Sequence, residues 1–167
     1  MSERSRKTLL TATALAAGLT LAAVTPALAG GTTSHAPRTA AVSSPAQGDP
    51  RSAAHHVADF YGAYIDAVWA ADDPTAAASA KALRGFYLSA GARKSVAAYE
   101  QREHADGILF AQNVPVKWQA AYTGSGAGHA TTRVTLTWGD GPHAEVSRID
   151  VQSDLKTLKI TGLRPAA

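Results

Sequence analysis

The stretch H-A-D-G-I-L-F-A-Q-N-V-P-V-K-W-Q-A-A-Y-T, residues 104–123, lies where the hydrophobic pattern of the chain changes. Before it, apolar residues recur every three or four positions, which is the spacing of one face of a helix. From residue 114 onward they recur at every second position, which is the spacing of a strand with one buried face. The chain therefore divides into a helical half and a sheet half, and this order predicts an α+β fold.

Three helices are expected before this stretch. The first is predicted to span residues 52–70, with Ser52 as its N-cap. Its apolar stripe consists of Val57, Tyr61, Tyr64, Ile65 and Val68.

The second and third helices are predicted from capping residues. Asp73 followed by Pro74 indicates the start of an alanine-rich helix that runs to about Phe86. The third helix is expected to follow Ser89 and to include His104 in its last turn, with Asp106–Gly107 as the stop.

Four strands are expected after the helices, joined by short connections. The first connection, residues 124–128, is rich in glycine and is predicted to be a flexible loop. In the third strand neither alternating set of residues is consistently apolar, so a β-bulge is expected midway along it. The predicted strands span residues 114–123, 132–138, 143–152 and 157–163.

The N-terminus has the three parts of a secretory signal peptide. Arg4, Arg6 and Lys7 form a positive region, residues 9–24 are free of charge and mostly apolar, and residues 27–29 read Ala-Leu-Ala. The apolar part is shorter than the roughly 20 residues that span a bilayer, which argues against the alternative of a retained membrane anchor. We therefore expect a secreted protein without a membrane span, cleaved after about Ala29.

Removal of residues 1–29 brings the net charge close to zero. The chain has 16 basic and 13 acidic residues, and the leader contains three basic residues and one acidic residue. The remaining chain therefore has 13 basic and 12 acidic residues. Nucleic acid is bound through clustered Lys and Arg, and no such block remains in the sequence. We therefore predict no nucleic-acid partner.

The remaining chain consists of a linker and one domain. Residues 30–52 contain prolines and no aromatic residue, which predicts a flexible linker. The chain has no cysteine, so its stability must come from packing. Residues 53–165 are enough chain to bury roughly two-thirds of the unfolded surface, and one domain is expected there.

The order of elements, together with three segments, resembles small secreted bacterial members of the nuclear transport factor 2-like superfamily. The segments are F-Y-G-A-Y-I-D-A-V-W (60–69), A-Q-N-V-P (111–115) and I-D-V-Q-S-D-L-K-T-L-K-I-T-G-L (149–163). The resemblance covers residues 53–165. It implies a cystatin-like α+β cone, in which three N-terminal helices pack on a curved antiparallel sheet of about four strands, with an open, mainly apolar mouth. The superfamily includes ketosteroid-isomerase-like enzymes, polyketide cyclases and members without a catalytic role.

An isomerase or cyclase would need a general base and a hydrogen-bond donor for the enolate. Tyr61 or Tyr64 could supply the donor, and a carboxylate close to an inward tyrosine hydroxyl would favour the enzyme. No ionisable residue is expected on the inward positions of the sheet. Asp66 shares a solvent-facing helix stripe with Asp59, and Glu145 would serve as a base only if it pointed inward. Catalysis is therefore left open, with a non-enzymatic function favoured.

A metal site has weaker support. His55, His56 and Asp59 are near one another in the first helix, and His55 and Asp59 are four residues apart and share a face. A closed zinc site needs four ligands, so a surface histidine pair is the simpler interpretation. No nucleophile or phosphate-loop motif is present in the sequence, and no cofactor is predicted.

A binding domain needs fewer specific residues than an enzyme or a metal site. Aromatic side chains with polar tips suit an apolar pocket, although they can equally fill the core. We therefore favour a secreted, non-enzymatic binding or accessory domain, monomeric or homodimeric, for a small apolar or amphipathic molecule. The alternatives are an isomerase or cyclase and a module that binds a secreted protein partner as an inhibitor or chaperone. The candidate ligand-contacting residues are Tyr61, Tyr64, Tyr99, Trp118, Trp138, His104 and Asn113.

Two interpretations of residues 104–115 remain open. The polar residues at its two ends either belong to a functional site or form the joint between the helical and sheet halves, and the joint is favoured. The functional interpretation would require His104 or Asn113 to reach the mouth of the cone.

Overall fold

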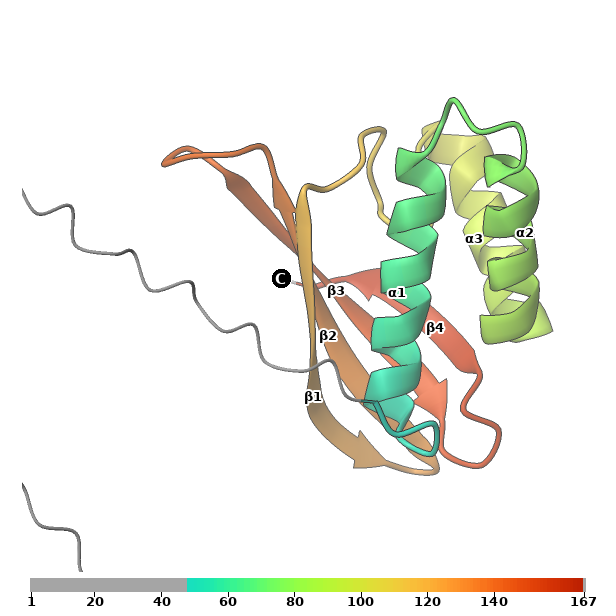
Figure 1. Cartoon of the computed structure of the whole chain (residues 1–167). Coiled ribbons are helices and arrows are strands. Elements are labelled where there is room, and N and C mark those ends of the chain that lie inside the picture. Colours follow the sequence, from blue (N-terminus) through green and yellow to red (C-terminus); the bar gives the residue numbers. More distant parts are fainter. Residues whose placement is uncertain (1–47, 167) are drawn as a thin grey trace, which may run out of the picture. The chain divides into compact units, whose positions relative to one another are not determined.

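The computed structural model describes residues 48–166, in which three helices precede a four-stranded sheet (Figure 1). The strands are all antiparallel and lie in the order β1-β2-β3-β4. The sheet is curved and open, and the α+β class with three helices before four strands is confirmed. The elements are α1 (Ala53–Trp69), α2 (Ala76–Tyr87), α3 (Ala90–Glu103), β1 (Lys117–Gly126), β2 (His129–Trp138), β3 (Glu145–Asp154) and β4 (Ile160–Pro165).

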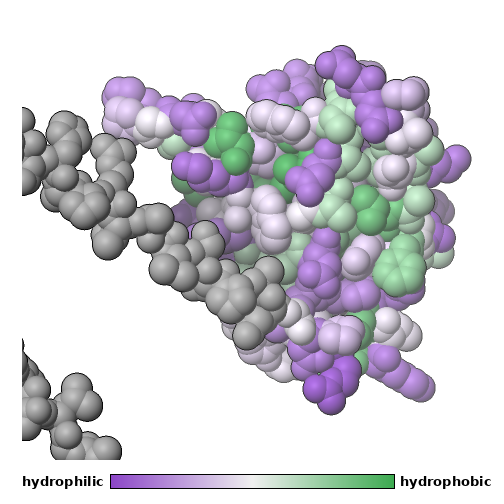
Figure 2. Space-filling model, viewed as in Figure 1, coloured by the Kyte–Doolittle hydropathy of each residue, from purple (hydrophilic) through white to green (hydrophobic). Residues whose placement is uncertain are grey.

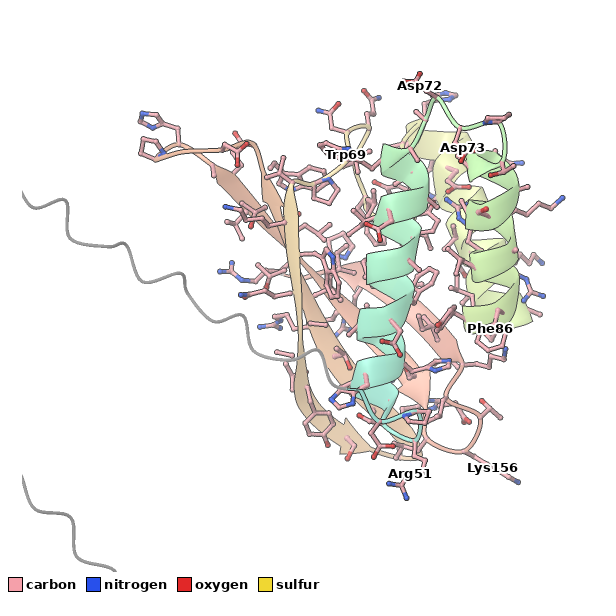
Figure 3. The ribbon with its side chains drawn as sticks, in the orientation of Figure 1. Arg51, Trp69, Asp72, Asp73, Phe86 and Lys156 are labelled. Carbon is pink, nitrogen blue, oxygen red and sulfur yellow. The ribbon has the colours of Figure 1, made fainter. Side chains whose placement is uncertain are left out.

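Helix α1 lies where the sequence predicts it. The Ser52 side chain accepts a hydrogen bond from the His55 N–H at 3.3 Å, so the predicted N-cap is confirmed. Except for Trp69, the large apolar residues of α1 face the sheet and the other helices, and Phe60 and Tyr61 are fully buried. Trp69 and Phe86 are among the exposed large apolar residues, and they lie at opposite ends of the α1–α2 pair (Figure 3).

Helix α2 begins later than predicted. Asp73 Oδ1 accepts hydrogen bonds from the Thr75 N–H and the Thr75 hydroxyl, both at 2.7 Å. This Asp side chain therefore closes a turn before the helix, and the first helical residue is Ala76.

Helix α3 begins after Ser89, as predicted, and the Ser89 hydroxyl accepts a hydrogen bond from the Ala92 N–H at 3.2 Å. Its end differs from the prediction. His104 is the C-cap rather than part of the last turn, and its φ of 53° lies in the left-handed region. The helix therefore ends at Glu103, three residues before Asp106.

The sheet corrects three expectations. Strand β1 begins at Lys117, and residues 114–116 belong to the segment that enters the sheet. The predicted flexible loop is mostly strand, because only Ala127 and Gly128 form the turn, with φ of 49° and 81°. The β2–β3 register runs without a break from His129↔Asp154 to Trp138↔Glu145, so no bulge lies midway along β3 in that pairing.

Register shifts occur elsewhere in the sheet. One lies between Tyr122 and Gly124 in β1, and the other lies between Gln152 and Ser153 in the pairing of β3 with β4. In β3 the buried set is Ile149, Val151 and Ser153, whereas Val146 is exposed. Val146 shares the outward face of β3 with Arg148 and Asp150, so the mixed pattern of this strand reflects an apolar residue on the uncovered face.

The core lies between the helices and one face of the sheet. Val134 and Leu136 of β2 and Val151 of β3 are fully buried there. The ring of Trp118 lies against the backbone of α1, and a Cβ atom on Gly62 would be 2.9 Å from Trp118 Cζ2. Among residues 48–166 no element covers the opposite face of the sheet (Figure 1).

The described residues include no helix with the length and apolar character needed to cross a membrane. Weakly to strongly apolar residues occur over the α1–α2 surface, among hydrophilic side chains (Figure 2). The predicted signal peptide, residues 1–29, and all but the end of the predicted linker lie outside the described residues.

Candidate functional site

Four of the aromatic residues predicted to bind a ligand make contacts within the protein core or the sheet instead. Tyr61 and Tyr64 have exposed fractions of 0% and 1%. Trp118 packs against the core at Gly62, and the Trp138 indole N–H donates to the Ser147 hydroxyl at 2.9 Å. The space between α1 and the sheet is therefore occupied by these side chains, and a ligand site has to be sought nearer the surface.

Tyr64 belongs to a hydrogen-bonded network that joins all three helices. Its hydroxyl donates to Asp106 Oδ2 at 2.5 Å, and the Arg84 guanidinium donates to the Tyr64 hydroxyl through Nε at 3.1 Å and also through Nη2. Arg84 Nη2 is also 3.1 Å from Asp106 Oδ2. From α3, Glu100 Oε1 lies 2.7 Å from Arg84 Nη1. The network thus fixes the segment after α3 to α1 and α2.

Asp106 has no acceptor position left for a further proton. Its Oδ1 accepts hydrogen bonds from the N–H groups of Ile108 and Leu109, at 2.7 Å and 2.9 Å. Its Oδ2 accepts from Tyr64 and Arg84. A carboxylate offers about four acceptor positions, and all four are used here. A general base has to accept another proton, so this carboxylate is suited to structure rather than catalysis.

The two buried tyrosines do not suit an enolate-stabilising role either. Burial raises the pKa of the Tyr64 hydroxyl above its ordinary value of 10.0, and the neighbouring Asp106 carboxylate adds to the increase. Burial also raises the pKa of Tyr61, whose hydroxyl donates to the Ile108 carbonyl at 3.1 Å. Both protons are therefore already committed to acceptors within the protein.

A surface groove lies directly beside this network. It has a volume of about 520 Å³ and runs between the C-terminal ends of α1 and α3 and the segment that leads into the sheet. The predicted residues His104 and Asn113 both line it, together with apolar and acidic side chains. Among residues 48–166 the groove is lined by Val68, Glu100, His104, Ala105, Asp106, Leu109, Ala111, Gln112, Asn113 and Val114.

Glu100 is the acidic residue of the groove that retains acceptor capacity. Its Oε1 accepts from the Gly107 N–H at 3.1 Å and pairs with Arg84. Among the contacts within residues 48–166, none involves Glu100 Oε2, and the side chain is 29% exposed. This oxygen can therefore accept a hydrogen bond from a ligand.

The polar rim of the groove is formed by the residues around the joint. His104 is exposed at the end of α3, and the Gln112 side-chain amide donates to the His104 carbonyl at 3.4 Å. Asn113 is exposed on the other side of the same groove. The joint and the groove are thus formed by the same residues, although the sequence presented the two interpretations as alternatives.

The other predicted site residues are dispersed. Asp66 and Glu145 are exposed, and neither lines the groove. Tyr99 contacts Phe110, with ring centroids 4.8 Å apart, and lines a separate hollow of about 240 Å³ between α3 and β4.

The three residues considered as metal ligands are not gathered into one site either, because the two histidines contact different parts of the protein. His55 Nδ1 accepts from the Asp49 N–H at 2.6 Å, and His56 packs against the ring of Tyr87 at 4.6 Å between centroids. Asp59 is exposed on the same helix. Within residues 48–166 no group of three or more His, Cys, Asp or Glu side chains is arranged to hold a metal ion.

Two important residues of the site were missed by the sequence analysis. Arg84 falls on the stripe Ala80, Leu83, Arg84 and Tyr87 of α2, which is the more buried side of that helix. Its position on that stripe was a usable signal, because an arginine on a buried face needs an acidic partner. No sequence pattern indicated that Glu100 would be one of its partners.

The fold has a counterpart among solved structures. The crystal structure of a protein of unknown function from Bacteroides thetaiotaomicron matches with a TM-score of 0.54, covering 68% of this chain and 88% of that chain. The two sequences are 18% identical, and likeness at that level shows the fold alone. No family model matches the chain, and neither does any curated protein.

Proposed function

We propose that this chain is a non-enzymatic binding domain of the nuclear transport factor 2-like type, and that its ligand is a small amphipathic molecule held in the groove beside Glu100. The observation that carries the proposal is the lining of that groove. An apolar floor lies next to a partly exposed carboxylate oxygen with free acceptor capacity.

The lining also indicates the chemistry of the ligand. Val68, Leu109 and Val114 offer apolar contact for a short hydrocarbon body. Glu100 and Asp106 carry two negative charges against the single positive charge of Arg84. The ligand that fits best is therefore an amine or another N–H donor attached to an apolar body.

An isomerase or cyclase is the alternative that a tyrosine beside a carboxylate would suggest. The Tyr64–Asp106 pair has this arrangement at 2.5 Å. Its four filled acceptor positions and its raised tyrosine pKa favour a structural role, and the proposal therefore assigns no catalytic residue.

The test compares two probes of equal length and opposite charge, octylamine and octanoate, by calorimetric titration of the purified protein. Octylamine is expected to bind and octanoate is not. In Glu100→Gln the octylamine affinity should fall at least tenfold, because a charge-assisted hydrogen bond contributes about 1.5–3 kcal/mol. The matched control is Glu103→Gln, because Glu103 lies on the same helix and pairs with Arg102 outside the groove.

A second variant separates binding from stability. Asn113→Trp is expected to fill the groove and to abolish octylamine binding while the melting temperature stays close to that of the parent protein, because Asn113 is exposed at the rim of the groove. Equal binding of both probes, or unchanged octylamine affinity in Glu100→Gln, would contradict the proposal.

A further inference from the structure

The uncovered face of the sheet carries one cation from each strand. These are Lys117 of β1, Arg133 of β2, Arg148 of β3 and Arg164 of β4. Their positions alternate with residues that point into the core, such as Val134 and Ile149, so all four point away from the helices. The side chains of Arg133 and Arg164 are 42% and 77% exposed, and Lys117 and Arg148 are exposed as well.

The register brings three of these cations around one carboxylate. Arg133 pairs with Asp150 across β2 and β3, and Asp150 pairs with Arg164 across β3 and β4. Neighbouring strands are about 4.8 Å apart, so the two arginine backbones are separated by roughly 10 Å. Arg148 is two residues from Asp150 on the same face of β3, which is about 7 Å along the strand.

The charges in this cluster are not balanced. Asp150 Oδ1 is 2.9 Å from Arg133 Nε, and Oδ2 is 3.6 Å from Arg164 Nη2. Asp150 thus lies among three arginines, a local net charge of +2, and Lys117 lies two rows away on the same face. Asp154 also points outward, but it lies two rows further along β3, and its Oδ1 accepts from the turn at Thr157.

This excess is a local feature and does not reflect the composition of the domain. Residues 48–166 contain 12 basic and 12 acidic side chains. Positive charge is therefore concentrated on the uncovered face, where neutral hydrogen-bonding residues lie between the cations. The intervening residues are Gln119, Thr135 and Thr137.

We infer that this face binds a linear phosphate polymer that has no bases. Three of the four cations are arginines, whose planar guanidinium groups match phosphate oxygens with two parallel hydrogen bonds. Proteins that bind single-stranded nucleic acid combine a basic surface with aromatic side chains on which bases stack. Trp118, Tyr122 and Trp138 of the described strands all occupy positions that point to the helix side. Phosphate groups are therefore recognised here and bases are not.

Inorganic polyphosphate is the probe for this inference, with oligo-deoxythymidine as the comparison. The purified protein should bind polyphosphate at low salt, and affinity should fall steeply with salt, with a log–log slope of roughly −2 to −3 for about four cations. Oligo-deoxythymidine of similar charge should bind at least tenfold more weakly. Equal or tighter binding of the oligonucleotide, or no polyphosphate binding at low salt, would overturn the inference.

Variants then locate the binding to this face. The double variant Lys117→Gln, Arg148→Gln should bind polyphosphate at least tenfold more weakly and with a shallower salt slope. Both residues are exposed, and neither forms an ion pair among residues 48–166, so the fold should be retained. The matched control is Lys81→Gln, Lys94→Gln, which removes two exposed lysines from α2 and α3. An equal loss of affinity in the control would contradict the assignment to the sheet face.

Discussion

Gly62 is a single position that constrains how α1 approaches the sheet. A Cβ atom at this residue would lie 2.9 Å from Trp118 Cζ2, closer than carbon atoms normally approach. We expect Gly62→Ala to lower the free energy of unfolding by about 1–3 kcal/mol, because the indole or the helix has to move. Urea denaturation monitored by tryptophan fluorescence measures this change.

Gly85 provides the control for this substitution. It is also a helical glycine, but no atom lies within 4 Å of the position that its Cβ would occupy. Gly85→Ala should therefore increase stability by about 0.5–1 kcal/mol, through the better helix propensity of alanine. If both substitutions shifted stability in the same direction, the contact with Trp118 would not be the cause of the effect at Gly62.

At the scale of elements, the end of α3 combines backbone strain with a position in the groove. His104 has a φ of 53°, a conformation that costs a residue with a Cβ roughly 1 kcal/mol and costs glycine nothing. We therefore expect His104→Gly to raise the free energy of unfolding by about 0.5–1 kcal/mol. The matched control is Ser95→Gly, which introduces glycine at an exposed interior position of the same helix and should lower stability by a similar amount.

Helices and strands could be predicted from the sequence because burial of one face makes apolar residues recur at a fixed spacing. The alternation of Val134 and Leu136 with polar neighbours predicted a strand, and the stripe through Val57 and Tyr61 predicted α1. Boundaries were less predictable because capping contacts decide them. Nothing in the local sequence separated a helix that begins at Asp73 from a turn closed by its carboxylate.

The candidate site was only partly predictable for a related reason. His104 and Asn113 stand out in the sequence, and the structure places both in one groove. The network behind them joins Tyr64, Arg84 and Asp106, which are separated by 20 to 42 residues. Contacts at such separations depend on how the helices pack, and a single sequence has no periodic signal for them.

At the scale of the whole molecule, the proposed binding role outside the cell depends on the predicted export. Residues 1–29 combine a positive start, an apolar stretch and the Ala27-Leu28-Ala29 pattern that signal peptidase recognises. We expect a bacterial host that expresses the full chain to release a protein that begins at Gly30. Intact-mass measurement of the protein in the culture medium checks this prediction.

Cleavage is the step that distinguishes a signal peptide from an anchor. The small side chain of Ala29 fits the peptidase, so Ala29→Trp should leave the leader attached and keep the protein in the membrane fraction. Ser34→Trp lies five residues beyond the expected cleavage site and should not change the mass difference between precursor and product. Recovery of the parent chain only from the membrane fraction, with its first residues intact, would identify the apolar stretch as an anchor. Because the described residues that line the groove beside Glu100 all lie within residues 68–114, the proposed ligand binding should be the same before and after cleavage.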